Sequence, residues 1–346
     1  MQIGKFNIGE NNKVFIIAEL SANHNGSLDT AIETIRAAKR AGADCIKLQT
    51  YTSDTITIDS DREDFIIKDT IWGGRKLYDL YNEAYTPWEW HEILFKVAEE
   101  EGLVCFSSPF DKTAVDFLEN LNVPAYKIAS FEITDIPLIE YVASKGKPVI
   151  ISTGIAELAD IELAIEACKR QGNNNIALLK CTSSYPAPIE EANMSMVKDL
   201  ADRFGVVSGL SDHTMGSIVP IVATALGAKI IEKHFILDRS ICGPDASFSM
   251  NEQEFKEMVQ AVRDAESAVG KVDYTLTEKQ AKGKDFSRSL YVVEDIKVGD
   301  FITDKNIRSI RPGFGLHPKY YFQLLGKKVK SNLLKGDRLN LNDIEL

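Results

Sequence analysis

The stretch Val206–Phe235, VVSGLSDHTMGSIVPIVATALGAKIIEKHF, decides the fold class of this chain. Two apolar runs, Val206–Asp212 and Lys229–Phe235, are typical of buried strands, and a segment of helix length separates them. Each run closes on a histidine, His213 in the first and His234 in the second. Consecutive parallel strands end at the same edge of a sheet, so the two imidazoles are expected to converge on one metal ion. The alternative is a pair of hydrogen-bonded core histidines.

The same alternation of strand and helix runs from residue 14 to about residue 270. Most of the strand candidates begin as continuous apolar runs, as parallel strands covered on both faces do. The candidates are Val14–Leu20, Cys45–Thr50, Leu103–Pro109, Ala125–Ser130, Pro148–Thr153, Ile176–Thr182, Val206–Asp212 and Lys229–Phe235. Eight β/α units in about 260 residues predict a closed (β/α)8 TIM barrel of the α/β class. The opening segment Ile3–Val14 is predicted to form a hairpin over one end of the barrel.

A second domain is expected after the barrel, because the pattern changes to short strands and tight turns. We assign residues 1–274 to the barrel, 275–285 to a polar linker and 286–346 to a small, mostly β domain. Residues 283–346 carry 12 Lys+Arg and 8 Asp+Glu, a net charge of +4, and the remainder carries 28 and 43, a net charge of −15. The acidic body makes nucleic acid an unexpected partner. A basic module could bring cations to an anionic substrate, although a solvated basic surface explains the charge equally well.

The composition is that of an ordinary soluble globular protein, with 44% hydrophobic and 26% charged residues. No apolar run approaches the length of a membrane span, and the N-terminus lacks the apolar core of a signal peptide. The five cysteines form no CxxC pair, and they are Cys45, Cys105, Cys168, Cys181 and Cys242. We therefore expect reduced thiols in a cytoplasmic protein that has no membrane partner.

The predicted strands turn polar at their C-terminal ends, the face where barrel enzymes place their active sites. Lys47 and Lys127 lie inside apolar strands, and a buried lysine costs several kcal/mol unless a partner compensates its charge. A structural salt bridge to Glu132 or Glu232 would supply such a partner. The neighbouring hydroxyls and the Ser152–Gly154 turn favour a cradle for phosphate and carboxylate instead. No GxxxxGK[ST] or GxGxxG motif occurs, which argues against ATP or NAD as the source of the phosphate.

Two carboxylates, Glu19 and Glu132, are expected near the metal, where they could orient sugar hydroxyls or manage a proton.

The motifs at the strand ends resemble those of the sialic acid synthases, enzymes that condense phosphoenolpyruvate with an N-acetylated sugar. The matching strings are Ala18–Gly26 (AELSANHNG), Ile46–Thr50 (IKLQT), Phe106–Phe110 (FSSPF), Tyr126–Glu132 (YKIASFE), Ser152–Gly154 (STG), Cys181–Pro186 (CTSSYP), Gly209–His213 (GLSDH), Glu232–Phe235 (EKHF) and Gly243–Asp245 (GPD). The strings Ile310–Gly313 (IRPG) and Leu333–Asp337 (LLKGD) resemble the antifreeze-like SAF domain that these synthases carry. The resemblance covers almost the whole chain.

Within that family, the chain is most similar to the branch whose product is pseudaminic acid. The supporting strings are Ser21–His24 (SANH), Asp245–Ser249 (DASFS), Ser287–Tyr291 (SRSLY) and Arg311–Lys319 (RPGFGLHPK). The resemblance implies a transferase that joins phosphoenolpyruvate, a 2,4-diacetamido-2,4,6-trideoxyhexose of the altrose type and water, and that releases phosphate by C–O cleavage. Synthesis of legionaminate or N-acetylneuraminate by the same chemistry is the alternative.

The resemblance also implies roles for particular residues. A divalent cation, manganese by family expectation, is held by His213 and His234, and these act with Glu19 as the catalytic residues. Phosphoenolpyruvate is bound by Lys47, Ser108, Lys127, Ser130, Ser152, Ser183 and Ser211. Relatives often have Thr at the position of Ser108, and some have Asn at that of Ser183. The sugar is bound by Gln49, Glu132, Tyr185, Asp245 and Arg311. The family places this arginine in the neighbouring site of a domain-swapped homodimer.

Two other classes of function remain as alternatives. A metal-dependent aldolase would use free pyruvate and would need no phosphate cradle. A non-catalytic protein would bind a sugar, with the small domain as an ice- or glycan-binding module, but pure binding needs no metal.

Overall fold

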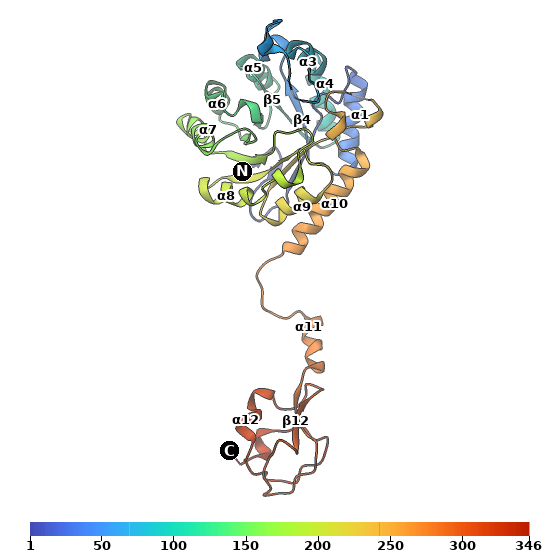
Figure 1. The fold of residues 1–346 in the computed structure, drawn as a ribbon, viewed down its shortest axis with the longest axis vertical. Coiled ribbons are helices and arrows are strands. Elements are labelled where there is room, and N and C mark those ends of the chain that lie inside the picture. The colour runs from blue at the N-terminus through green and yellow to red at the C-terminus, as the bar shows by residue number, and fades with distance from the viewer. Residues whose placement is uncertain (69, 242, 346) are drawn as a thin grey trace. The chain divides into compact units, whose positions relative to one another are not determined.

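The computed structural model describes residues 1–68, 70–241 and 243–345. The chain divides into two compact units, Met1–Gly270 and Lys271–Leu346. Figure 1 shows the first unit as a ring of helices around strands and the second as a small domain of short elements.

The first unit is the predicted TIM barrel. Its eight parallel strands form one closed barrel, in which β10 pairs with β3 to complete the ring. The strands are β3 (Phe15–Glu19), β4 (Cys45–Thr50), β5 (Val104–Pro109), β6 (Tyr126–Ile128), β7 (Val149–Ser152), β8 (Ile176–Cys181), β9 (Val207–Asp212) and β10 (Ile230–His234). Each lies within its predicted range. The largest difference is at β6, which stops before Ser130, because this residue begins the 3-10 turn η3 (Ser130–Glu132) instead of continuing the ladder.

Eight main helices alternate with the strands and cover the outside of the barrel (Figure 1). They are α1 (Leu28–Arg40), α4 (His91–Glu100), α5 (Lys112–Asn120), α6 (Ile136–Ala143), α7 (Leu158–Arg170), α8 (Ser195–Phe204), α9 (Ile218–Ala225) and α10 (Glu252–Val269). Side-chain caps fix several starts, as at α10, where Asn251 and Glu254 form a reciprocal capping box. The apolar stripe Phe255, Met258 and Val262 of α10 is buried, and each such side chain stabilises the fold by about 1.5–3 kcal/mol.

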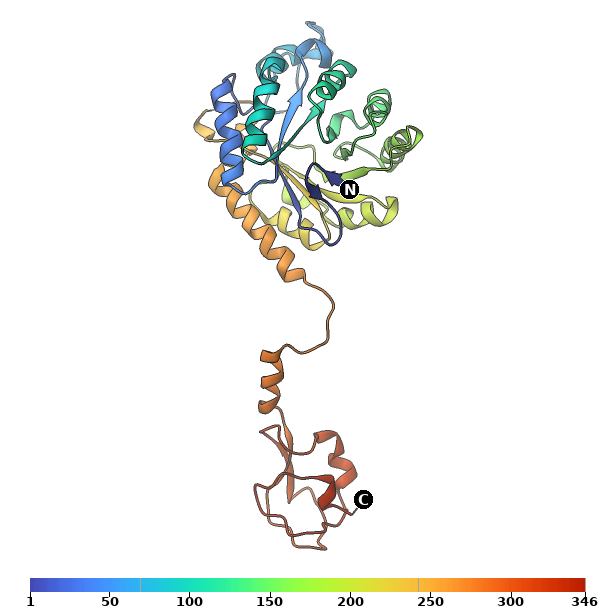
Figure 2. The ribbon, with the colours of Figure 1, turned by 180° about the vertical axis from the view of Figure 1, so that it is seen from behind.

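Apolar side chains fill the barrel interior and close one end of it. Phe15, Ile17, Phe106 and Leu179 belong to a buried cluster inside the ring of strands. The same cluster includes Ile3, from the predicted N-terminal hairpin of β1 (Gln2–Ile3) and β2 (Phe6–Asn7). Figure 2 shows this hairpin lying across the barrel. The prediction of a hairpin is confirmed, although the hairpin spans Gln2–Asn7 and not Ile3–Val14. The C-terminal ends of the strands remain available for a site.

A long connection between β4 and α4 is the main departure from a regular β/α unit. We call residues 51–90 the β4–α4 segment, and the strand–helix pattern did not predict its internal structure. It contains α2 (Ser53–Ile56), η1 (Glu63–Phe65), α3 (Leu77–Ala84) and η2 (Trp88–Trp90). An isolated antiparallel bridge joins Ile66 to Lys76. Three further 3-10 turns follow later strands, η4 (Ile189–Glu191), η5 (Arg239–Ile241) and η6 (Ala246–Phe248).

The second unit has a small apolar core that includes Leu290, Val292, Ile307 and Leu339. Its elements are α11 (Glu278–Lys282), η7 (Gly283–Phe286), β11 (Ser289–Val292), β12 (Ile307–Ile310), η8 (Pro318–Tyr320), α12 (Tyr321–Leu324) and η9 (Leu341–Asp343). Strands β11 and β12 are antiparallel, and isolated bridges extend the pairing. The segment expected to be a polar linker therefore contains the short helix α11.

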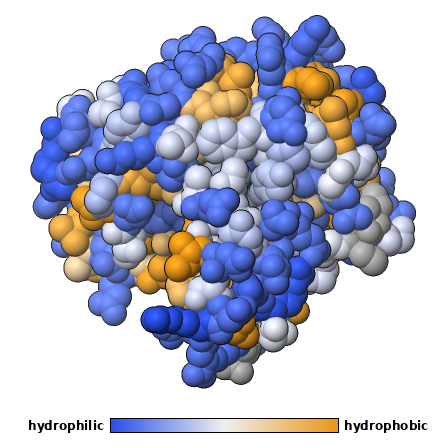
Figure 3. All heavy atoms as spheres, turned by 90° about the horizontal axis from the view of Figure 1, so that it is seen from above, coloured by the Kyte–Doolittle hydropathy of each residue, from blue (hydrophilic) through white to orange (hydrophobic). Residues whose placement is uncertain are grey.

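The face of the protein seen from above is mostly polar. Figure 3 shows one face, on which hydrophobic residues form separate groups among hydrophilic ones. Within residues 1–68, 70–241 and 243–345, no helix combines the length and the apolar character needed to cross a membrane. Four cysteines, Cys45, Cys105, Cys168 and Cys181, are buried free thiols, and Cys242 lies outside the described residues.

Candidate active site

A cavity of about 450 Å³ lies at the C-terminal ends of the barrel strands. Twelve of the fifteen residues singled out from the sequence line it. They are Glu19, Lys47, Gln49, Lys127, Ser130, Glu132, Ser152, Tyr185, Ser211, His213, His234 and Asp245. These residues come from seven of the eight strands or from the loops that follow them, so the closed barrel is what brings them together.

Three of the singled-out residues do not line this cavity. Ser108 is the second-last residue of β5 and is buried, and its hydroxyl has no hydrogen-bond partner. Ser183 follows β8, and its Oγ lies 3.9 Å from Sγ of the cavity residue Cys181. Arg311 is exposed in the second unit.

Lys47 at the floor of the cavity is held between two carboxylates. Its Nζ lies 2.9 Å from Oε1 of Glu232 and forms a second ion pair with Glu19. Gln49 donates a hydrogen bond of 2.9 Å from Nε2 to Oε1 of Glu19. Burial lowers the pKa of Lys47, but the charges of Glu19 and Glu232 outweigh it, so the pKa is raised and the amine stays protonated. Of the two salt-bridge partners that the sequence suggested, Glu232 pairs with Lys47 and Glu132 does not.

Lys127 has weaker compensation for its charge. Its Nζ donates to Oγ of Ser152 at 2.7 Å and to the carbonyl of Ile128 at 3.0 Å, both neutral groups. The nearest carboxylate oxygen, Oε1 of Glu232, is 3.8 Å away. Burial lowers the pKa of Lys127, as expected for an ammonium group with too few anionic partners. An anion bound beside Lys127 would supply the missing partner.

Glu232 links the two lysines, a role that the sequence suggested only as an alternative. Burial raises its pKa, but Lys127 and Lys47 outweigh that effect and lower it to about 2. Ser211 donates to Oε1 of Glu232 at 3.0 Å, while Oε2 has no hydrogen-bond partner. The signal in the sequence was the spacing of Glu232 and His234 on β10, which puts both side chains on one face of the strand.

Gly154, after β7, allows two serine hydroxyls to approach the chain closely. The backbone N–H of Gly154 donates to Oγ of Ser130 at 3.1 Å. A Cβ at this position would collide with the hydroxyls of both Ser183 and Ser130. Glycine is therefore needed here because only a residue without a side chain leaves room for them. The three residues therefore bring polar groups together just after Ser152, the hydrogen-bond partner of Lys127.

The two strand-end histidines lie together, with ring centroids 5.3 Å apart. Nδ1 of His213 is 3.0 Å from the carbonyl of Thr182, which favours the tautomer with its lone pair on Nε2. Nδ1 of His234 is buried and has no hydrogen-bond partner. Burial lowers the pKa of His234 to about 3, so its ring is neutral and able to bind a cation. The pair fits a divalent cation better than it fits a satisfied core.

The donor set around such a cation is small. Within the described part of the chain, no group of three His, Cys, Asp or Glu side chains is close enough to hold a metal ion. Two imidazoles would leave several coordination positions for water and substrate oxygens, as a Lewis-acid role requires.

Cys181, at the end of β8, lines the cavity but was not among the site residues predicted from the sequence. Its Sγ lies 3.8 Å from Nδ1 of His213. Burial raises the pKa of this thiol, but the contact with His213 outweighs it and lowers the pKa to about 7. Burial lowers the pKa of His213, and Cys181 raises it. Since a bound cation requires the neutral imidazole, cation binding and protonation of His213 compete.

Two further carboxylates lie at the cavity wall. Burial raises the pKa of Glu132 to about 7, and its Oε2 has no hydrogen-bond partner. Asp245 accepts a short hydrogen bond from the hydroxyl of Ser21, and its Oδ2 lies 3.7 Å from Nδ1 of His234. Both are placed to accept hydrogen bonds from a polyhydroxylated ligand.

Aromatic rings surround the histidines on the open side. The ring of Tyr185 is 4.5 Å from that of His213, and the ring of Phe248 is 5.0 Å from that of His234. Trp72 of the β4–α4 segment packs against Tyr185 at 5.8 Å. Trp72 and Phe248 were given no role from the sequence, although Phe248 lies in the string Asp245–Ser249.

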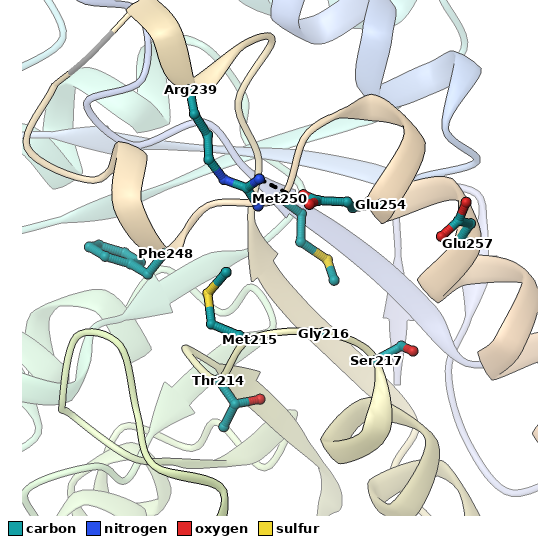
Figure 4. Close-up of a pocket in the computed structure, with 9 residues that line it drawn as sticks. All are labelled: Thr214, Met215, Gly216, Ser217, Arg239, Phe248, Met250, Glu254 and Glu257. Atoms are coloured by element: carbon teal, nitrogen blue, oxygen red, sulfur yellow. Dashed lines mark hydrogen bonds and ion pairs between the residues drawn. The ribbon is translucent and has the colours of Figure 1, made fainter.

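A second, smaller cavity of about 120 Å³ lies beside the first and shares Phe248 with it (Figure 4). Its one cationic side chain, Arg239, is already paired, because Nη2 and Nη1 of Arg239 contact the two carboxylate oxygens of Glu254, and the carboxylate of Glu257 accepts a hydrogen bond from Nε2 of Gln253. None of the residues singled out from the sequence lines it. We therefore place the candidate active site in the larger cavity.

Comparison with known proteins identifies relatives over the full length of the chain. The chain is 51% identical over 345 residues to the pseudaminic acid synthase of Campylobacter jejuni subsp. jejuni serotype O:2, covering 100% of each. It is 48% identical to the pseudaminic acid synthase of Helicobacter pylori, covering 95% of this chain and 97% of the relative. Its structure resembles that of an N-acetylneuraminic acid synthetase from Leptospira borgpetersenii serovar Hardjo-bovis, with a TM-score of 0.74 and 31% identity over 82% of this chain and 94% of the other.

Sequence profiles of known domains agree with the two units. Residues 287–345 match the SAF domain, as the sequence predicted. Residues 34–274 match the NeuB family. With that match and relatives of this similarity over its whole length, the chain belongs to the NeuB family.

Proposed function

We propose that this chain is a pseudaminic acid synthase that condenses phosphoenolpyruvate with a 2,4-diacetamido-2,4,6-trideoxyaltrose and water, giving pseudaminic acid and phosphate. The proposal rests mainly on one observation. A single cavity contains two buried lysines and two buried histidines whose imidazoles can be neutral. It occurs in a chain 51% identical, over its whole length, to a pseudaminic acid synthase. The phosphate and the carboxylate of phosphoenolpyruvate are anions that the lysines can bind. The aldehyde oxygen of the sugar is a ligand that a cation on the histidines can bind.

Phosphoenolpyruvate is proposed to bind at the floor of the cavity. Lys127, with its weakly compensated charge, attracts the phosphate or the carboxylate, and Lys47 completes the positive floor. Ser130, Ser152 and Ser211 line the same floor and can donate hydrogen bonds. Ser108 and Ser183 stay in the proposed set, although neither lines the cavity.

A divalent cation, manganese by family expectation, is proposed to be held by His213 and His234. When bound, such an ion supplies Lewis acidity toward the aldehyde oxygen of the open-chain sugar. The chain orients its two imidazoles for this purpose through the carbonyl of Thr182 and the burial of His234.

The remaining steps are assigned to the carboxylates. Carbon 3 of phosphoenolpyruvate bonds to the aldehyde carbon, and positive charge develops at the former enol carbon, where the anionic Glu232 stabilises it. Water adds there, and phosphate leaves with the bridging oxygen. Burial raises the pKa of Glu19, which suits this carboxylate to take the proton of that water.

The sugar is proposed to lie between the floor and the open side of the cavity. Gln49, Glu132, Tyr185 and Asp245 line this region, and Arg311 is proposed to come from the second subunit of a domain-swapped homodimer. The segment before α11 supports a dimer. Its side chains Val272 and Tyr274 are 89% and 95% exposed, and a second copy of the chain would cover them. We propose residues 1–274, 275–285 and 286–346 as barrel, linker and SAF domain, and the cytoplasm as the compartment that keeps the buried thiols reduced.

The deciding experiment uses phosphoenolpyruvate labelled with ¹⁸O at the bridging oxygen, with the purified protein, Mn²⁺ and candidate sugars. We expect ¹⁸O in the released phosphate and the mass of pseudaminic acid in the product. Turnover only with the legionaminate precursor or with N-acetylmannosamine would favour a sister activity. Use of free pyruvate without phosphate release would indicate an aldolase, and sugar binding without turnover a binding protein.

A further inference from the structure

The cavity has two walls of opposite character. The floor carries the lysines and serines of the strand ends, whereas the β4–α4 segment presents apolar side chains to the same space. These side chains belong to Ile56, Ile67, Trp72, Leu77, Leu80 and Tyr81, and we call them the apolar wall. Four of the six are purely aliphatic, and the hydroxyl of Thr70, which also lines the cavity, already accepts a hydrogen bond from the backbone N–H of Trp72, so this side of the cavity offers a ligand few hydrogen bonds.

The apolar wall is fastened to the rest of the barrel. Trp72 donates a hydrogen bond of 3.1 Å from Nε1 to the carbonyl of Pro244, and its ring packs on that of Tyr185. Leu80, on α3, is 7% exposed and anchors the other end. Because both ends contact other elements, the wall lies in a defined position beside Tyr185 and Asp245.

The position of the wall relative to the reacting groups decides which part of a sugar it meets. The aldehyde carbon has to lie near the histidines and the floor, at the strand ends. Carbon 6 is the far end of an open-chain hexose, and it extends away from the strand ends toward the loops. A hydroxyl on carbon 6 would lose its water there without gaining a partner, whereas a methyl group would gain contacts.

We propose that the apolar wall selects sugars that carry a methyl group at carbon 6, and so sets the preference for 6-deoxy over 6-hydroxy substrates. The inference rests on the proposed function and adds its specificity determinant. An apolar pocket discriminates against an added hydroxyl by roughly 10- to 100-fold in kcat/KM. We expect a preference of that size for 2,4-diacetamido-2,4,6-trideoxyaltrose over its 6-hydroxy analogue.

The test compares Ile67→Thr with Ile71→Thr, two identical substitutions in one segment. Ile67 lines the cavity, whereas Ile71 is 54% exposed and does not line it. Ile67→Thr should reduce the preference for the 6-deoxy sugar at least about tenfold, because the new hydroxyl can bond the 6-hydroxyl. Ile71→Thr should keep the wild-type ratio. Leu77→Gln is a second variant of the apolar wall. An unchanged KM for phosphoenolpyruvate in a variant shows that the floor of its cavity is intact.

The outcomes separate the two proposals. Equal use of both sugars by the wild type, or wild-type ratios in both Ile67→Thr and Leu77→Gln, would overturn the role of the wall while phosphate release upholds the synthase. If the wild type releases no phosphate with any candidate sugar, the proposed function fails and the inference with it.

Discussion

The roles of Lys47 and Lys127 depend on their partners, and the residue type alone does not reveal these partners. Both lysines were expected to need anionic partners, and sequence alone left a salt bridge and a phosphate cradle open. In the structure the two differ, because Lys47 pairs with Glu19 and Glu232, whereas Lys127 contacts mainly neutral groups. Partners that lie on other strands could not be assigned from the chain order.

This difference predicts unequal effects of two identical substitutions. Lys127→Met should lower kcat/KM for phosphoenolpyruvate by about 10- to 150-fold, the value of one charge-assisted contact of roughly 1.5–3 kcal/mol. Lys47→Met should in addition lower the free energy of unfolding by about 3–5 kcal/mol, because it leaves the buried Glu19 without its ion-pair partner and Glu232 with Lys127 alone. Steady-state kinetics and urea denaturation measure the two effects. Normal kinetics in Lys127→Met would assign this lysine to structure alone.

The histidine pair predicts a loss of activity without a loss of the fold. His213→Ala and His234→Ala should each abolish turnover and the binding of one Mn²⁺ per subunit, while the fold stays intact. The side chains lie at strand ends beside a cavity, so their loss opens little new space in the core. Metal content after dialysis, circular dichroism and phosphate release test the three statements. Full metal binding by either variant would remove that histidine from the site.

Glu132 predicts a pH dependence of stability. Its pKa in the folded protein is raised from 4.5 to about 7, mainly by burial. The folded state therefore binds the proton more tightly, so the stabilisation is complete below pH 4.5 and is lost as the pH rises through about 7. Glu132→Gln should remove this loss, and at pH 8 it should be more stable than the wild type by up to roughly 3 kcal/mol.

Melting temperatures at pH 5 and pH 8 check this sign, with the exposed Glu92→Gln as the control. A Glu132→Gln variant whose melting temperature changes with pH as much as that of the wild type would contradict the shift.

At the scale of elements, the barrel strands were predictable and the β4–α4 segment was not. Each strand is a short apolar run that ends in polar residues. This pattern is local in the sequence, so it predicts the strand without knowledge of how the barrel closes. The apolar residues Ile56, Ile67 and Trp72 follow no period of 2 or 3.6, and they contact the cavity through tertiary packing alone. The polar floor of the candidate site was thus predictable from the strand ends, whereas its apolar wall was not.

Packing between strands makes Gly209 on β9 a test of barrel geometry. A Cβ there would collide with the carbonyl oxygen of Ile230 on β10 and lie 2.7 Å from Cδ2 of Leu179 on β8. Gly209→Ala should therefore destabilise the protein by about 1–3 kcal/mol or more through forced strand movement. Gly9→Ala, where nothing lies within 4 Å, is the matched control. Equal unfolding midpoints for the two variants would show that β9 and β10 can separate without cost.

At the scale of the whole molecule, the open question is how the second unit serves the barrel. Arg311 is exposed on this unit, and the segment that joins the units carries the exposed side chains Val272, Tyr274 and Leu276. Contacts between two copies leave no pattern in one chain, so neither strand periodicity nor the fold of each unit assigns Arg311 to a site. The proposed domain swap therefore needs a test that reports on subunits rather than on residues.

Mixing two inactive variants provides that test. In a swapped dimer of His234→Ala and Arg311→Ala, one site receives both lesions and the other receives none, because each site combines one subunit's barrel with the other's SAF domain. Random exchange of equal amounts makes half of the dimers mixed, so about one quarter of wild-type activity should return. Mixing His213→Ala with His234→Ala should restore nothing, because both lesions lie in the barrel and every site keeps one. Phosphate release after exchange, with mixed dimers verified by native mass spectrometry, gives the result. If mixed dimers form and the first pair stays as inactive as the second, Arg311 serves the site of its own chain.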